Sequence, residues 1–171
     1  MYKKIAITGP ESTGKTMLSE ALAVHYKTAC VPEYARSYMA TLNRHYEPRD
    51  LEIIAKRQLK LLSKYENQND NILISDTELI VIKIWFEHAF KMCPKWILNK
   101  LNQQNFSLYL LCDIDLPWIP DPQREHPHLR EYFFNLYKAE LDTRQWPYAI
   151  ISGKEFRRVD NAIKVIDKIL Q

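Results

Sequence analysis

Two glycines, a lysine and a threonine near the N-terminus have the spacing of a loop that binds phosphate. Gly9 and Gly14 enclose four residues, and Lys15 and Thr16 follow at once, which matches the pattern G-x-x-x-x-G-K-[ST]. Such glycines let backbone N–H groups turn inward around phosphate oxygens, while the lysine supplies positive charge and the threonine hydroxyl can bind Mg²⁺. The apolar run 4–8 and the helical pattern on either side are the context that this chemistry requires. The pattern therefore predicts a P-loop that binds ATP and Mg²⁺.

The residues between and after these glycines extend the predicted nucleotide site. Only three glycines occur in 171 residues, against about twelve at the usual ~7%, and two of them are in this motif. Glycine is thus concentrated where a backbone must turn or approach a ligand. The predicted ATP-binding residues are Gly9, Glu11, Ser12, Thr13, Gly14, Lys15, Thr16 and Met17. Lys15 is also predicted to be catalytic. The competing interpretation is a glycine turn that only caps the following helix.

A carboxylate at the end of a buried strand is the second candidate for the chemistry. The apolar run Ile72–Ser75 ends at Asp76, which is followed by Thr77 and Glu78. In a parallel sheet the carboxyl end of this strand lies at the ligand-binding edge. Asp76 is predicted to contact the substrate and either to hold Mg²⁺ with Thr16, directly or through water, or to accept the proton of the acceptor hydroxyl. The pattern leaves these roles open, and Asp76 as the N-cap of a helix near Glu78 is a further alternative.

An irregular loop over residues 117–130 is the third candidate. Four prolines in it argue against a helix, and Arg124 and Arg130 lie towards its end. Enzymes of phosphoryl transfer place cations over the transferring group, where an arginine raises the rate about 10³–10⁵-fold in measured systems. We therefore predict that this loop is a lid and that both arginines are catalytic. The alternatives are solvent-exposed arginines at a helix start and, with weaker support, a metal site at His126 and His128, which lack a third ligand.

The segment Pro32–Arg36 follows a short apolar run and is the candidate site for a phosphate acceptor. Ligands of open α/β sheets collect at this edge. Glu33 can accept hydrogen bonds from sugar hydroxyls, Tyr34 can stack on a ring, and Arg36 can hold an anion. Trp118, in the predicted lid, is a candidate wall for a flat ring. The alternatives are surface residues at a helix start and a core position for the tryptophan.

Short apolar runs alternate with longer helical patterns and must position these residues. The expected strands are Lys4–Thr8, Ala29–Val31, Ile72–Ser75, Ser107–Cys112 and Tyr148–Ile151. The expected helices are Lys15–His25, Asp50–Asn67 with Asp50 as its N-cap, Glu78–Lys91, Lys95–Gln103, His128–Thr143 and Asp160–Leu170. Strands buried on both faces and alternating with helices predict a three-layer α/β/α fold with a parallel sheet. With no linker or repeat in the chain, residues 1–171 are expected to form a single domain.

Composition and charge argue against several other classes of protein. The formal charge is only +3, and basic and acidic residues are interspersed, so no nucleic-acid partner is expected. No apolar run approaches the ~18 residues of a membrane span, and the apolar run near the N-terminus is too short for a signal peptide. The three cysteines are far apart, as expected of reduced thiols. Together these features predict a cytoplasmic protein with no membrane partner.

Several motifs in combination resemble one family. The P-loop carries Glu-Ser at its second and third variable positions, and the chain also contains Val31–Arg36, Ser75–Thr77, Leu111–Trp118 and Pro120–Arg124. Over nearly the whole chain, this combination is similar to the ribosylnicotinamide kinase domain of NadR-type proteins. That family lies in the nucleoside and nucleotide kinase branch of P-loop folds, and its relatives are often described only as AAA or ATPase domains.

The resemblance implies both a topology and a reaction. It implies a five-stranded parallel sheet in the order 2-3-1-4-5. It also implies ATP-dependent phosphorylation of nicotinamide riboside to nicotinamide mononucleotide. The loop 151–153 would then lie near adenine, with Gly153 in the loop and Arg157 or Arg158 beside it.

Two other functions compete with a kinase. The first is a GTPase-type switch, because Asn99–Asn102 approximates a guanine-binding motif, but it lacks the final carboxylate and lies in a helical stretch. The second is a non-catalytic ATP-binding regulatory or sensor module, which a P-loop alone does not exclude. Asp76 and the two lid arginines favour catalysis on a small nucleoside acceptor. The oligomeric state is open, and a homo-oligomer is compatible with the sequence.

Overall fold

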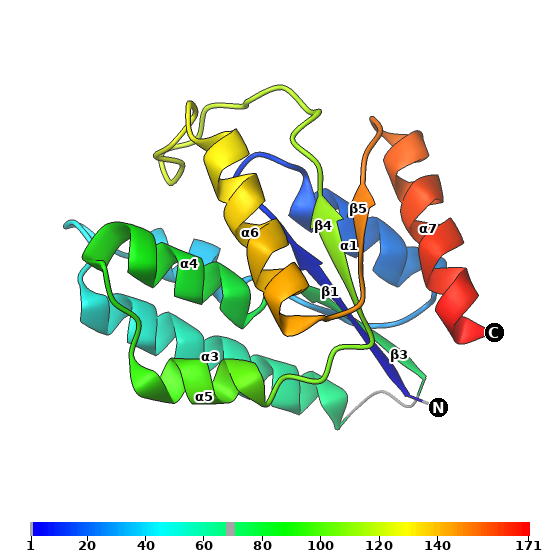
Figure 1. Cartoon of the computed structure of the whole chain (residues 1–171), viewed down its shortest axis with the longest axis horizontal. Coiled ribbons are helices and arrows are strands. Elements are labelled where there is room, and N and C mark those ends of the chain that lie inside the picture. The colour runs from blue at the N-terminus through cyan, green and yellow to red at the C-terminus, as the bar shows by residue number, and fades with distance from the viewer. Residues whose placement is uncertain (1, 68–70) are drawn as a thin grey trace.

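The computed structural model describes residues 2–67 and 71–171, and its centre is one parallel β-sheet (Figure 1). The strands are β1 (Lys3–Thr8), β2 (Cys30–Val31), β3 (Ile72–Asp76), β4 (Leu108–Cys112) and β5 (Tyr148–Ile151). Their order in the sheet is β2-β3-β1-β4-β5, and every neighbouring pair is parallel. The expected sheet and its strand order are both confirmed.

Helices cover both faces of this sheet. They are α1 (Lys15–His25), α2 (Tyr34–Met39), α3 (Pro48–Glu66), α4 (Leu79–Phe90), α5 (Lys95–Asn102), α6 (Arg130–Arg144) and α7 (Phe156–Leu170). Helices α1 and α7 pack on one face, whereas α3, α4, α5 and α6 pack together on the other (Figure 1). The three-layer α/β/α fold is therefore confirmed. None of the helices in the described part of the chain is long and apolar enough to cross a membrane.

The central strand β1 shows why the sheet has a core on each face. Ile5 and Ile7 pack in the cluster that contains α1 and α7, whereas Ala6 packs in the cluster on the opposite face. Successive side chains of a strand point to opposite faces, and all three residues are fully buried. A strand that is apolar on both faces is typical of the middle of a parallel sheet.

The register of the strands brings the candidate segments to one edge of the sheet. Ile7 of β1 pairs with Asp76 of β3, and the N–H of Thr77 donates to the carbonyl of Ile7 at 3.0 Å. The loop after β1 therefore begins beside the end of β3. On the other side of β1, Thr8 pairs with Leu111 of β4, so the segment after β4 leaves from the same edge.

The start of α3 differs from the expectation. The N-cap of this helix is Glu47, and Asp50 is the third helical residue of a capping box. Asp50 is buried, and its carboxylate pairs with Arg44 at 2.7 Å and accepts a hydrogen bond from Tyr38 at 2.8 Å. The bond from Arg44 holds the pKa of Asp50 well below its usual range. Asp50 therefore takes part in the cap of α3 from the third helical position, where it accepts the N–H of Glu47 at 2.7 Å, and it also ties the end of α2 to the start of α3.

Three helix positions also depart from the sequence pattern. Helix α2 (Tyr34–Met39) was not expected, because six residues make fewer than two turns and show no readable period. Helix α6 begins at Arg130, two residues after the expected His128. Helix α7 begins at Phe156 rather than Asp160, with Glu155 as its N-cap, and its first turn packs against the loop after β5.

Candidate functional site

Gly9 and Gly14 adopt backbone conformations that other residues rarely adopt. The φ angle is +130° at Gly9 and +76° at Gly14. A Cβ atom at Gly9 would lie 3.1 Å from the carbonyl oxygen of Cys112, and one at Gly14 would lie 3.0 Å from the side chain of Leu116. Gly14 is also the N-cap of α1, so the free N–H groups of the first helical turn point at the loop. The loop thus combines a tight turn with the positive end of a helix.

Lys15 lies against the carbonyl groups of the same loop. Its ammonium group donates to Gly9 at 3.0 Å and to Pro10 at 2.8 Å. The hydroxyl of Thr13 also donates to the carbonyl of Pro10, at 2.8 Å, and stiffens the turn. A lysine charge beside a helix N-terminus attracts anions. The ammonium group of Lys15 can therefore exchange the loop carbonyls for the oxygens of a bound phosphate.

Thr16 and Asp76 form the candidate metal site. The hydroxyl of Thr16 donates to Oδ2 of Asp76 at 2.7 Å, and Asp76 is 2% exposed. The other oxygen, Oδ1, is buried and has no hydrogen-bond partner among the described residues. Burial raises the pKa of Asp76, and the bond from Thr16 opposes that rise. A buried carboxylate oxygen beside a hydroxyl is an oxygen donor set of the kind that Mg²⁺ prefers, so these residues fit the implied metal.

Asp76 does not cap a helix, and that alternative is wrong. Asp76 is the last residue of β3, and the N-cap of α4 is Glu78, whose carboxylate accepts the N–H of Ile80 at 2.7 Å. Between them, Thr77 has a φ of +69°, which is unfavourable for a β-branched residue. This kink separates the two carboxylates, so that Glu78 serves the helix and Asp76 stays beside Thr16.

Glu78 is a buried carboxylate that sequence reasoning did not identify as part of the site. It is 3% exposed, and it accepts hydrogen bonds from the hydroxyl of Thr8 and the amide of Gln104, both at 3.0 Å. Burial raises the pKa of Glu78 to about 7. Since Thr8 immediately precedes the P-loop, Glu78 connects the loop to the start of α4. The sequence signal was an acidic residue before an apolar helix, but its partner Thr8 is 70 positions away.

The segment 117–130, the predicted lid, lies against the P-loop. The hydroxyl oxygen of Ser12 accepts the N–H of Ile119 at 2.9 Å, and the carboxylate of Glu11 accepts the N–H of Glu125 at 3.2 Å. Burial raises the pKa of Glu11. In this structure, two variable residues of the P-loop therefore hold the lid, a contact that their sequence spacing did not indicate.

Both lid arginines reach the P-loop and are half-buried. Arg124 donates to the carbonyl of Ile119 and lies 3.4 Å from the hydroxyl of Ser12. Arg130 donates to the carbonyl of Leu116 at 2.8 Å and to that of Ser12 at 3.3 Å. Its Nε is buried and has no hydrogen-bond partner within the described part of the chain. The alternative of solvent-exposed arginines is therefore wrong, although their catalytic role stays a prediction.

Glu33 and α2 lie on the side of the site predicted to hold the acceptor. Glu33 is half-buried at the start of α2, and burial raises its pKa while the positive charge of Lys15 opposes the rise. The backbone N–H of Tyr34 donates to the side chain of Gln58 at 2.8 Å. Arg36 forms an ion pair at 3.0 Å with Asp121 of the lid. The lid thus touches the P-loop and α2 together.

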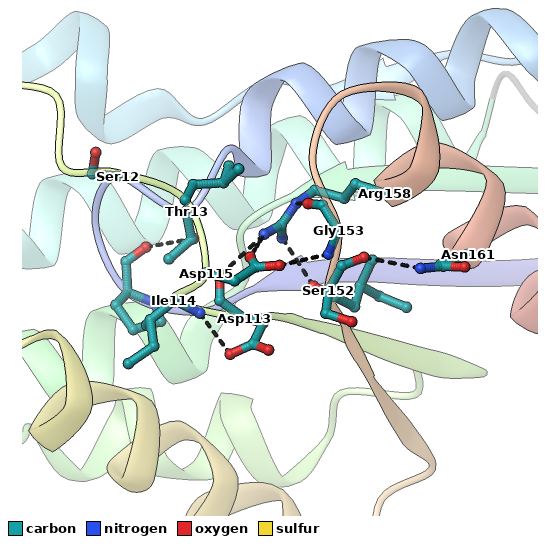
Figure 2. Close-up of polar contacts among 12 residues, drawn as sticks. Ser12, Thr13, Asp113, Ile114, Asp115, Ser152, Gly153, Arg158 and Asn161 are labelled. Carbon is teal, nitrogen blue, oxygen red and sulfur yellow. Dashed lines mark hydrogen bonds and ion pairs between the residues drawn. The ribbon is translucent and has the colours of Figure 1, made fainter.

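Three predicted contact residues lie outside this polar network. Met17 is 72% exposed on the first turn of α1, and Trp118 is half-buried within the lid. Arg157 is exposed on the first turn of α7, whereas its neighbour Arg158 is 4% exposed and bonds to the loop after β5 (Figure 2). Both arginines expected near this loop adjoin it: a Cβ atom at Gly153 would lie 3.4 Å from the Cβ of Arg157, and the guanidinium group of Arg158 donates to the carbonyl of Gly153.

A comparison with known protein families places this chain in one of them. A family model of an AAA domain matches residues 4–158. Because this match covers most of the chain, the chain belongs to that AAA-domain family. The matched range contains the P-loop, Asp76, the whole lid and Arg158.

Solved structures of known proteins share the fold. The structure of NadR protein in complex with NR matches with a TM-score of 0.83 at 21% identity, over 98% of this chain and 50% of that one. NadR protein in complex with NAD and AMP-PNP matches with a TM-score of 0.81 at 21% identity, over 98% and 49%. Deoxyadenosine kinase from M. mycoides matches with a TM-score of 0.70 at 12% identity, over 96% and 99%. The chain spans about half the length of the NadR chains, and these TM-scores show a common fold.

Proposed function

We propose that this protein is a kinase that transfers the γ-phosphoryl group of ATP to a hydroxyl of a small nucleoside-like acceptor. The observation that supports this most is the meeting of three groups at one edge of the sheet. They are the Lys15 ammonium in its loop, the Thr16–Asp76 pair, and the lid arginines bound to Ser12. Phosphoryl transfer depends mainly on positioning and on neutralising phosphate charge, and these are the groups that do so.

Each residue has a distinct task in the proposed reaction. Lys15 leaves the loop carbonyls and binds oxygens of the β- and γ-phosphates. Thr16 and Asp76 hold Mg²⁺, directly or through water. When bound, that ion neutralises charge on the two outer phosphates. Arg124 and Arg130, which already lie at the loop, neutralise the oxygens of the transferring group.

The acceptor proton needs a carboxylate, and we assign it to Glu33. The acceptor oxygen bonds to the γ-phosphorus, and the bond from that phosphorus to the β–γ bridging oxygen breaks, which releases ADP. The proton of the acceptor hydroxyl passes to the carboxylate of Glu33. Asp76 already shares Oδ2 with Thr16 and is kept for the metal. Glu33 is half-buried beside Lys15, and its raised pKa makes it a better proton acceptor than an exposed glutamate.

Nicotinamide riboside is the acceptor that we propose. The fold is shared with NadR protein in complex with NR. Nicotinamide riboside carries a positive charge on its ring, and burial disfavours the ionised forms of Glu11 and Glu33. A bound cation would restore those forms, so each charge would stabilise the other. Tyr34 and Trp118 supply aromatic faces for the ring.

An assay of acceptor-dependent ADP release tests the proposed function. Purified protein with Mg²⁺ and ATP is given nicotinamide riboside or one of the common nucleosides. A kinase releases ADP in proportion to one acceptor, whereas a regulatory sensor responds to none. Lys15→Ala is the matched control: it should keep the fold and lose at least about 10²-fold in rate. Acceptor-dependent turnover that survives this substitution would remove the assignment of Lys15.

A further inference from the structure

A buried arginine at the start of α7 joins two loops beside the P-loop (Figure 2). Nε and Nη1 of Arg158 donate to the carbonyls of Gly153 and Ile151, both at 2.9 Å. Nη2 donates to the carbonyl of Asp113 at 3.3 Å and to the carboxylate of Asp115. The other oxygen of that carboxylate accepts the N–H of Gly153 at 2.6 Å. One guanidinium group therefore binds the loop after β5 and the loop after β4 at once.

The loop after β5 is shaped closely around this arginine. Gly153 has a φ of +106°, and a Cβ atom there would lie 3.2 Å from the backbone nitrogen of Arg158. Asn161, three residues further along α7, donates to the carbonyl of Ser152 at 3.1 Å. Helix α7 thus fixes the loop through two side chains.

The loop after β4 extends the connection to the P-loop and the lid. Leu116 follows Asp115 directly, and its side chain lies against Gly14. The carbonyl of Leu116 accepts a hydrogen bond from Arg130 at 2.8 Å, and Arg130 also donates to the carbonyl of Ser12. Contacts therefore run without a gap from Arg158 through the base of the lid to the phosphate-binding loop.

We propose that Arg158 and Asp115 form a clamp that positions the loop after β5 and the base of the lid together. The clamp then fixes the position of a nucleotide bound beside the loop after β5 relative to Arg130 at the P-loop. The inference rests on the proposed kinase function, because it assigns the loop to the adenosine part of ATP. Arg158 is a positioning residue: all its hydrogen bonds go to the protein, and its flat fork reaches acceptors on both loops. A lysine at this position could pair with Asp115, but its single ammonium group could not reach the acceptors of both loops at once.

The central experiment compares Arg158→Lys with Arg57→Lys, the same substitution at an exposed position of α3. AMP-PNP affinity is measured by calorimetry, and KM for ATP and kcat are measured with nicotinamide riboside. Losing the bonds of a charged donor predicts at least about a tenfold weaker AMP-PNP affinity and a similar rise in KM. Because the lid base is also released, kcat should fall as well. The control should match the wild type.

Lid protection provides a readout that does not need activity. Trypsin cleavage after Arg124 should be faster in Arg158→Lys than in the wild type and in the control. Asp115→Asn tests the same clamp from its partly exposed member and guards against a misfolded lysine variant. If the two residues act together, the double variant loses less than the product of the two single losses.

The outcomes separate the clamp from the proposed function. Lower melting temperatures with unchanged KM, kcat and lid cleavage in both variants would mean that Arg158 only stabilises the fold, and the clamp would be refuted. If the fold-losses of the two single variants multiply in the double variant, the two residues act independently, and the clamp would be refuted as well. If the wild type itself neither binds AMP-PNP nor transfers phosphate, the kinase proposal fails, while the cleavage rate still decides whether Arg158 holds the lid.

Discussion

Replacing Glu78 with glutamine should make the stability of this protein less dependent on pH. Glu78 is fully enclosed, and its carboxylate accepts hydrogen bonds from Thr8, Ile80 and Gln104. An amide has nearly the same shape, and the hydroxyl of Thr8 can turn to accept from its NH₂ group. In Glu78→Gln the packing and the hydrogen bonds are therefore kept, and the titration is removed.

The size and sign of the effect follow from the raised pKa of Glu78. Between its ordinary value of 4.5 and about 7, the folded protein keeps a proton that the unfolded chain has released. More protons are bound in the folded state, so its stability falls as the pH rises through this interval. The stability that Glu78 contributes is fully present below pH 4.5, the ordinary pKa, and is lost above about pH 7, the raised pKa. The interval of about 2.5 units corresponds to about 3 kcal/mol.

Urea unfolding followed by tryptophan fluorescence measures this difference. The free energy of unfolding is determined for both proteins at about pH 5 and at about pH 8. The two should be similar at the lower pH, and Glu78→Gln should be more stable by up to about 3 kcal/mol at the higher one. Burial also raises the pKa of Glu11, Glu33 and Asp76, but they are present in both proteins and cancel. Parallel stability curves across this range would refute the reasoning.

Three substitutions test the proposed reaction. Asp76→Asn should lower both kcat and the affinity for ATP in the presence of Mg²⁺, as expected of a residue that holds the metal; a lowered kcat with wild-type ATP affinity by calorimetry would instead assign the acceptor proton to Asp76. Glu33→Gln should lower kcat by about 10²-fold or more and flatten the acidic limb of the pH–rate profile, whereas an unchanged profile would exclude Glu33 as the proton acceptor. Arg124→Ala should lower kcat with little change in ATP affinity, and a wild-type kcat would show that the lid acts without it.

Much of the fold could be predicted because its signals are local. Each buried strand is a short apolar run, and most helices show a readable period, so the sheet and its layers followed from neighbouring residues. The P-loop is likewise a contiguous motif, and all its defining residues lie within eight positions of the chain. Asp76 could be placed because a strand end is visible in the sequence. Short α2 could not, because it is less than two turns long.

By itself, then, the sequence determined which segments form the sheet and which residues stand at its carboxyl edge. Only the tertiary structure decided how those residues are held. Glu78 meets Thr8 across 70 positions, and Arg158 meets Asp115 across 43. Such pairs depend on which strands lie side by side and in what register. That information is spread over the whole chain, and no local period or spacing carries it.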